Sequence, residues 1–170
     1  MITTITSAEI KDVLMEPKEK VLKEPYSIIH SPQTQENLTV LLSGKNGSEF
    51  NKTIGFIPKY PAALIYKCLY GQGVIIIQRN DELGEAKEVR IAGLRPGVEI
   101  EVPSGYAHAF ANIGKNFLIM VDNAPKEDKY KDSEEIEAHH GLAYYIIDKK
   151  GEIAFEKNDN YPFHPQISNY

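Results

Sequence analysis

The stretch GFIPKYPAALIYKCLYGQGVIIIQ (residues 55–78) contains two apolar runs on either side of a Gly-Gln-Gly turn. The runs ALIYKCLY (63–70) and GVIIIQR (73–79) are rich in aromatic and β-branched residues, which is typical of β-strands. The two glycines predict a tight connection between them. Because successive side chains of a strand point to opposite faces, we expect Leu64, Tyr66 and Cys68 to share one face of the first strand.

Similar strand-like runs recur along the chain at intervals of about 8 to 12 residues, which indicates a single all-β domain, either a sandwich or a closed barrel. The other runs are EPYSIIHS, LTVLLSG, FNKTIGFI, AKEVRIAGL, VEIEVPS, AHAFANIG, NFLIMVDN and the hairpin-like LAYYIIDKKGEIAFEKN. Two segments break this rhythm and predict short peripheral helices. SAEIKDVLMEP is expected to be capped by Ser7 and to end before Pro17, and KEDKYKDSEEIEAHH to form an exposed, charged loop with a helix.

Composition narrows the classes of partner. The chain has 170 residues and a net charge of −5, and its lysines are scattered among carboxylates, which argues against a nucleic-acid partner. No segment approaches the roughly 20 apolar residues of a membrane span, and the N-terminus does not resemble a signal peptide. Cys68 is the single cysteine, so no disulfide can form within the chain, and we expect a cytoplasmic location.

Two segments resemble the two motifs of cupins, in the version found in the archaeal-type glucose-6-phosphate isomerase family. The first is GSEFNKTIGFIP followed by ALIYKCLYGQGVIIIQ, and the second is RPGVEIEVPSGYAHAFANIGKNFLIMVDNAP. The second is the more specific, with the family's pattern at Pro96, Gly97, Val102, Pro103, Ala107, His108, Asn112 and Gly114.

The resemblance implies a cupin-type double-sheet β-barrel (jelly roll) and a cytoplasmic homodimer. It also implies a divalent metal (iron, nickel, zinc or manganese) and interconversion of glucose 6-phosphate and fructose 6-phosphate in glycolysis and gluconeogenesis. With it, we expect residues 1–36 to be an N-terminal extension packing on the barrel, 37–160 the cupin barrel, and 161–170 an irregular C-terminal tail.

The ligand positions of the family are mostly replaced. The resemblance places its two motif-one histidines at Phe56 and Pro58 and its glutamate at Leu64, so His108 is the only ligand position retained. One imidazole cannot supply the three protein ligands that a catalytic metal site typically has. We therefore expect no cofactor. The adjacent His139 and His140 should face different directions and so should not form a second site.

Every second residue of a barrel strand points inward, and with the resemblance this gives a candidate pocket. Its members are Thr53, Gly55, Phe56, Leu64, Tyr66, Tyr106, His108 and Phe110. Thr53 and Gly55 are expected either to contact a phosphate or to serve close packing. Tyr66 either touches a sugar or fills the barrel. His108 is either a residual ligand or acid–base group, or a histidine satisfied by Tyr66 or a backbone carbonyl.

Two functions remain open, and no catalytic residue is assigned. The residues favour a degenerate, metal-free and non-catalytic cupin that binds a small molecule or serves as a scaffold. The alternative is an active sugar-phosphate isomerase that uses residual groups, since the fold resemblance and Tyr66 and His108 remain. A sensor or storage cupin for an apolar ligand is a third possibility. The expected partners are a sugar phosphate or another small ligand and a second copy of the chain.

Overall fold

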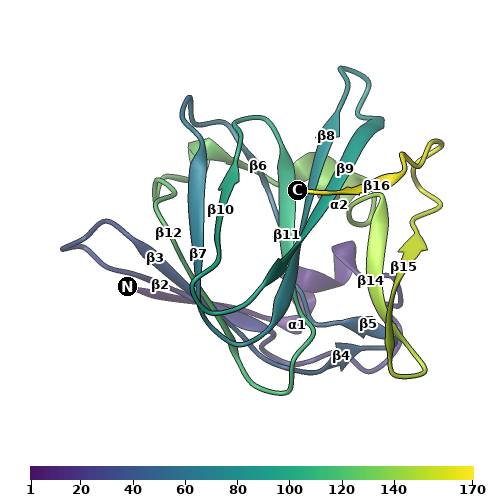
Figure 1. Cartoon of the computed structure of the whole chain (residues 1–170), viewed down its shortest axis with the longest axis horizontal. Helices are drawn as coiled ribbons and strands as arrows, with labels where there is room; N and C mark the ends of the chain where they lie inside the picture. The colour runs from purple at the N-terminus through teal and green to yellow at the C-terminus, as the bar shows by residue number, and fades with distance from the viewer.

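Two facing sheets form the body of the protein (Figure 1), as a computed structural model of residues 1–170 shows. The larger sheet has six strands in the spatial order β1-β2-β3-β12-β7-β10. These are β1 (Ile2–Ile5), β2 (Tyr26–His30), β3 (Asn37–Leu41), β12 (Leu118–Asp122), β7 (Leu64–Tyr70) and β10 (Glu99–Val102). The N-terminal segment thus adds two strands, β1 and β2, to the edge of this sheet.

The opposite sheet has four strands in the order β11-β8-β9-β16. These are β11 (Ala107–Asn112), β8 (Gly73–Asn80), β9 (Ala86–Leu94) and β16 (Ile167–Asn169). The all-β, cupin-type double-sheet fold is confirmed. The expectation of an irregular tail is wrong for β16, which pairs in parallel with β9. Backbone pairing with an edge strand requires no apolar pattern in the added strand, so β16 could not be recognised from the sequence.

Two smaller sheets and short helices complete the chain. One sheet pairs β13 (Lys131–Asp132) with β6 (Ile57–Pro58), and the other has the order β15 (Glu152–Lys157), β14 (Tyr144–Lys149), β5 (Glu49–Phe50) and β4 (Lys45–Asn46). The helical segments are α1 (Ser7–Ile10), η1 (Lys11–Val13), η2 (Asp128–Tyr130) and α2 (Glu134–Ala138). The longest of them, α2, has five residues, and no helix could serve as a membrane span.

The local elements expected from the sequence are found in part. The predicted hairpin is present, with β14 and β15 joined by the two-residue turn Lys150–Gly151, where both φ angles are positive. The first helix is capped by Thr6 rather than Ser7, because Thr6 and Glu9 form a reciprocal capping box. The run FNKTIGFI is not one continuous strand. Its backbone pairs with β11 through two isolated bridges, from Lys52 to Ala111 and from Phe56 to His108.

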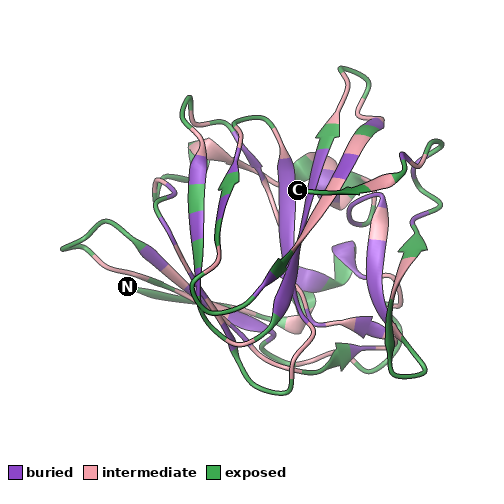
Figure 2. Ribbon diagram, in the orientation of Figure 1, coloured by how far each residue is buried: buried purple, intermediate pink, exposed green.

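Strand β11 is buried along its whole length (Figure 2), because each of its faces is covered. One face carries His108 and Phe110 toward the six-stranded sheet. The other carries Ala109 and Ala111 toward β14. These two alanines and Ile146 of β14 border a small cavity between the two strands. On β7, by contrast, Leu64, Tyr66 and Cys68 are buried and the residues between them are exposed, as the alternation predicts.

Gly55 lets the segment before β6 approach β11 closely. Its φ is +84°, and a Cβ at this position would lie 2.5 Å from the backbone oxygen of His108. A side chain would therefore add both strain in the left-handed region and a collision with backbone. This close approach is what holds Phe56 against His108, whose ring centroids are 4.6 Å apart.

Replacing Gly55 with alanine should therefore cost more stability than the same change at Gly97. Gly97 also has positive φ (+92°), but a Cβ there would meet nothing within 4 Å. We expect G97A to lower the free energy of unfolding by about 1 kcal/mol through strain, and G55A by about 2 to 4 kcal/mol because overpacking adds to it. Urea denaturation of both variants measures the difference. Equal losses would contradict the close-approach role of Gly55.

Candidate functional site

A cavity of about 80 Å³ lies between the two main sheets, and we call it the inner chamber. It has room for several water molecules or for part of a small ligand. Polar side chains on its wall are Tyr26, Asn37, Thr39, Thr53, Asp122 and Lys131. The rest of the wall is formed by Ile28, Gly55, Phe56, Tyr66, His108, Phe110 and Ala124. The site therefore combines aromatic surface with a few polar groups, as ligand pockets commonly do.

The centre of the inner chamber is a hydrogen bond across the barrel. The Tyr66 hydroxyl lies 2.7 Å from His108 Nε2. Tyr66 comes from the six-stranded sheet and His108 from the four-stranded one, and they are 2% and 1% exposed. Phe56 and Phe110 surround the pair, with their ring centroids 4.6 Å and 6.0 Å from that of His108. Tyr66 is one of the two hydrogen-bond partners expected from the sequence for a His108 that binds no metal.

Burial keeps this histidine neutral. Removal from water lowers the pKa of His108 to about 4, and the Tyr106 carbonyl opposes the shift weakly. Burial raises the pKa of Tyr66 well above its usual range, and the negative charge of Asp122 raises it further, so the phenol stays protonated. His108 Nδ1 has no hydrogen-bond partner of good geometry.

These facts favour one tautomer. The Tyr66 hydroxyl has no other partner in the structure, so it is satisfied as a donor only if Nε2 accepts its proton. The ring proton then lies on Nδ1, on the side of the Tyr106 carbonyl. We assign this arrangement from the hydrogen-bond network. In it, the Nε2 lone pair is occupied by Tyr66.

The structure brings six of the eight predicted pocket residues together at the inner chamber. These are Thr53, Gly55, Phe56, Tyr66, His108 and Phe110. The other two lie elsewhere. Leu64 is buried in the hydrophobic core, and Tyr106 does not border the chamber but donates its hydroxyl proton to Glu88 of β9. Leu64 lies at the start of β7, beyond the chamber, and Tyr106 lies in the turn before β11.

The residues at the expected metal position do not fit a metal. Phe56, Pro58 and Leu64 have no donor atoms in their side chains, and His108 Nε2 is already bonded to Tyr66. Nowhere in the chain do three or more His, Cys, Asp or Glu side chains gather closely enough to hold an ion. His139 and His140 are also turned to different partners, the carbonyls of Glu135 and Asp12. A first-row divalent metal requires several N, O or S ligands in one place, and this donor set does not provide them.

Asp122 is one of several chamber residues that were not predicted from the sequence. It ends β12 directly opposite Tyr66 on β7, and it is 7% exposed. Burial raises its pKa, while hydrogen bonds from Asn37 and Ala124 act in the opposite direction. The signal was present in the run NFLIMVDN, because a strand with Leu118 and Met120 facing inward also turns Asp122 inward.

Thr39 and Lys131 were missed for other reasons. Thr39 faces inward from β3, a strand outside both motifs. Lys131 belongs to the charged run that was expected to be fully solvated, but β13 pairs with β6 and brings it to the chamber wall. Its Nζ lies 5.8 Å from the Phe56 ring centroid.

Glu49 lies outside the inner chamber. Its carboxylate is 1% exposed and lies 2.6 Å from Lys52 Nζ. It also accepts a hydrogen bond from the Met15 amide (3.1 Å), and Lys52 donates to the Val13 carbonyl. Burial raises the pKa of Glu49, and Lys52 opposes this. The pair ties the N-terminal segment to β5, which is a structural role.

Comparison with known proteins agrees with this architecture. The family model described as glucose-6-phosphate isomerase matches residues 6–163. The glucose-6-phosphate isomerase of Pyrococcus furiosus is 31% identical over 149 residues, covering 85% of this chain and 75% of the relative. That of Pyrococcus horikoshii is 30% identical with the same coverage.

Among solved structures, a Drosophila melanogaster CENP-C cupin domain superposes with a TM-score of 0.43 and 12% identity. The superposition covers 62% of this chain and 71% of that domain. A superposition this loose says nothing about activity.

The lowered pKa of His108 predicts a specific pH dependence of stability. Between pH 6.5 and pH 4 the unfolded chain binds a proton on this imidazole that the folded chain does not bind. The free energy of unfolding should therefore fall by about 3 kcal/mol as the pH is lowered through this window, and no further below it. His108→Gln keeps a group that can bond to Tyr66 but does not titrate, so it should lack this loss.

Urea denaturation of the wild type and H108Q from pH 4 to pH 7 isolates the effect, because the carboxylates Glu49 and Asp122 contribute to both proteins. Identical pH dependence in the two proteins would show that the imidazole is not held neutral by burial.

Proposed function

The chain belongs to the glucose-6-phosphate isomerase family, and we propose that it is a metal-free member that binds a small polar molecule in the inner chamber without catalysing isomerisation. The observation that carries this proposal is the hydrogen bond between Tyr66 and His108. It occupies the one retained ligand atom, while Phe56 fills the adjacent position with carbon. Polar groups on the remaining wall support binding of a ligand that carries hydrogen-bonding groups.

The absence of catalysis follows from what isomerisation requires. Moving a proton between C1 and C2 of an open sugar needs a base near these carbons and an electrophile that stabilises the developing oxyanion. In the family, the metal would supply the electrophile. Here the positions that the resemblance assigns to its ligands carry Phe56, Pro58 and Leu64. The proposal is therefore a binding function that retains the barrel.

One observation favours a second candidate function. Asp122 places a carboxylate on the chamber wall, and Lys131 places a cation on the same wall. Together they could act as base and electrophile for an isomerase that works without metal. A role in glycolysis or gluconeogenesis would follow for this second candidate alone.

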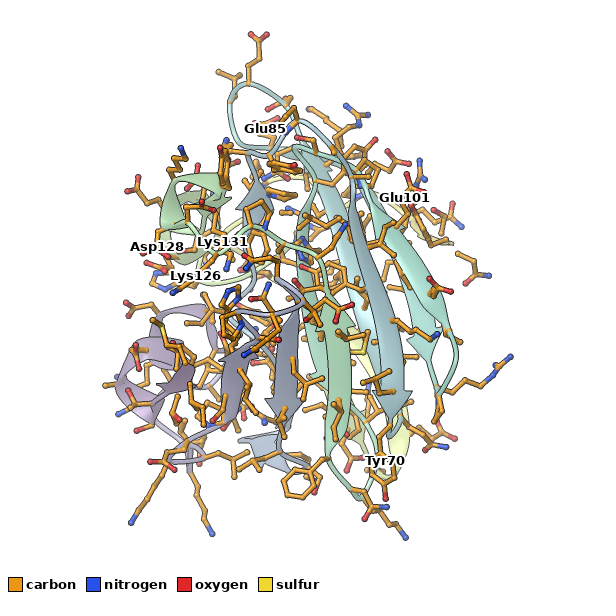
Figure 3. All side chains as sticks on the ribbon, turned by 90° about the vertical axis from the view of Figure 1, so that its left-hand side faces the viewer. Tyr70, Glu85, Glu101, Lys126, Asp128 and Lys131 are labelled. Carbon is orange, nitrogen blue, oxygen red and sulfur yellow. The ribbon has the colours of Figure 1, made fainter.

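Family membership also supports a cytoplasmic homodimer. On the outer face of the six-stranded sheet, Ile65 and Leu69 are 47% and 45% exposed. Tyr70 is 48% exposed and lies at the lower end of β7 in Figure 3. Exposed apolar side chains that gather on one face commonly mark a contact with another protein, and a second copy of the chain is the partner that the family suggests.

Metal loading and turnover together test the main proposal. After incubation with iron, nickel, zinc or manganese and dialysis, the purified protein should retain less than about 0.1 equivalent of each. A coupled assay with fructose 6-phosphate should show no turnover with or without these metals, while the Pyrococcus furiosus enzyme serves as the positive control. Metal-dependent turnover that is lost in His108→Ala would refute the proposal.

The second candidate gives a different result in the same assay. Turnover would then be present without added metal, would be unaffected by a chelator, and would fall by about 100-fold or more in Asp122→Asn. H108Q should leave most of that activity intact, since it retains a partner for Tyr66. Turnover at the level of the uncatalysed reaction in the wild type would rule this candidate out.

A further inference from the structure

Asp122 presents an unused carboxylate oxygen to the inner chamber. Its Oδ1 accepts hydrogen bonds from Asn37 Nδ2 and from the Ala124 amide, both at 2.8 Å. Its Oδ2 has no partner among the protein atoms, yet it is not among the atoms sealed off from solvent. Since Asp122 is more than nine-tenths buried and lines the chamber, the accessible surface of Oδ2 faces this cavity.

The Asn37 side chain, which is hydrogen-bonded to two further groups, fixes the orientation of this carboxylate. Asn37 Nδ2 also donates to the Ala124 carbonyl at 2.9 Å, and its Oδ1 lies 2.9 Å from His30 Nδ1. Because the Asn37 amide nitrogen is the donor in two bonds, its oxygen must accept the proton of His30. A buried charge held by such a network loses little entropy when a ligand binds to it.

Hydroxyl groups lie on the same wall. Thr39 has no hydrogen-bond partner for its side chain, although it is only 6% exposed. Thr53 Oγ1 accepts from the Phe110 amide at 3.0 Å, and the Tyr26 hydroxyl accepts from the Ile54 amide at 3.3 Å. Both therefore keep a proton to donate. The chamber thus offers a charged acceptor together with several groups that can donate or accept.

A cation lies where the inner chamber opens. A larger hollow of about 1020 Å³, which we call the vestibule, shares Ile28, Asn37, Ala124 and Lys131 with the inner chamber. Lys131 forms no ion pair within 4 Å. The adjacent carboxylate, Asp132, forms its ion pair with Lys59. Lys126, Asp128 and Lys131, which are labelled in Figure 3, all line the vestibule. The charged side chains that line the vestibule are Lys126, Glu127, Asp128 and Lys131, and the His30 imidazole lines it too.

We propose that the inner chamber binds a small hydroxylated anion, with a ligand hydroxyl donating to Asp122 Oδ2 and the anionic group held by Lys131 at the opening. The opposite charges at the two ends select a ligand that has hydrogen-bond donors at one end and negative charge at the other. A charge-assisted hydrogen bond in a desolvated cavity is stronger than one in water, so Asp122 is the main determinant of specificity. The aromatic rings of Phe56 and Phe110 cover the carbon skeleton.

This inference rests on the proposed binding function, and it assigns the ligand class and the residues that recognise it. Asp122→Asn is the suitable variant because its side-chain oxygen can still accept from Asn37 and Ala124. The new NH₂ group then faces the chamber, where it opposes a ligand donor instead of accepting from it. Asp159→Asn is the matched control, since Asp159 is exposed and lines no part of the chamber.

Lys131→Met removes the cation and keeps most of the side-chain length. Lys129→Met is its control, because Lys129 is an exposed residue of the same loop and lines neither the chamber nor the vestibule. Thermal denaturation of all four variants verifies that they are folded.

Isothermal titration calorimetry of the full chain with four probes tests the proposal. The probes are glucose 6-phosphate, gluconate, the neutral polyol sorbitol and inorganic phosphate. At least one of the two hydroxylated anions should bind about 10-fold more tightly than sorbitol and phosphate do. D122N should weaken its binding by about 10- to 100-fold and K131M by about 10-fold, while D159N and K129M should change nothing. The preference between phosphate and carboxylate identifies the anionic group.

Three results would overturn the inference: no binding of any probe, binding that D122N leaves unchanged, or inorganic phosphate binding as tightly as the hydroxylated anions. These outcomes are separate from a failure of the proposed function. Metal-dependent turnover would disprove the metal-free proposal, and the D122N comparison would still decide the role of Asp122. Conversely, binding that is insensitive to D122N would leave the metal-free proposal intact.

Discussion

The hydrogen bond from Tyr66 to His108 determines the chemistry of this barrel. It joins the two main sheets at 2.7 Å, between two side chains that are almost completely buried. Such a bond contributes only about 1 kcal/mol net, but leaving a buried partner unsatisfied costs about 1 to 3 kcal/mol. The tyrosine and the histidine therefore depend on each other. The imidazole stays neutral because it is buried, and its one available lone pair is used within the protein.

The remaining substitutions are consistent with that pairing. Phe56 packs its ring against His108, and Gly55 permits the close approach that brings it there. The cavity also has a carboxylate on the neighbouring strand, where Asp122 stands opposite Tyr66. The activity of such a fold depends on the groups that line its cavity, so the fold alone does not establish activity.

Much of the fold could be predicted from the sequence, because its determinants are local. Alternation placed Leu64, Tyr66 and Cys68 on one buried face, and the turn residues located the hairpin at Lys150–Gly151. What was missed depends on contacts distant in sequence. Strand β16 exists because the edge of β9 accepts it, and Lys131 reaches the chamber because β13 pairs with β6.

The candidate site was predictable to a similar degree. The motifs identified His108 and its surroundings, but they directed attention to the positions where the resemblance places metal ligands. Leu64 belongs to the packed core, and Tyr106 lies in a turn that carries it away from the cavity. Asp122 lies in the second segment but is not one of its pattern positions, and its place at the cavity depends on strand register, which sets it against Tyr66. Register is decided by the whole sheet rather than by a short pattern.

Nitrogen NMR of the His108 ring tests the central claim most directly. The account predicts a neutral imidazole at pH 7, protonated at Nδ1, whose Nε2 accepts a hydrogen bond that disappears in Tyr66→Phe. Addition of zinc should leave both nitrogen signals unchanged. A ring protonated at Nε2, or an Nε2 signal that shifts on zinc binding, would contradict it.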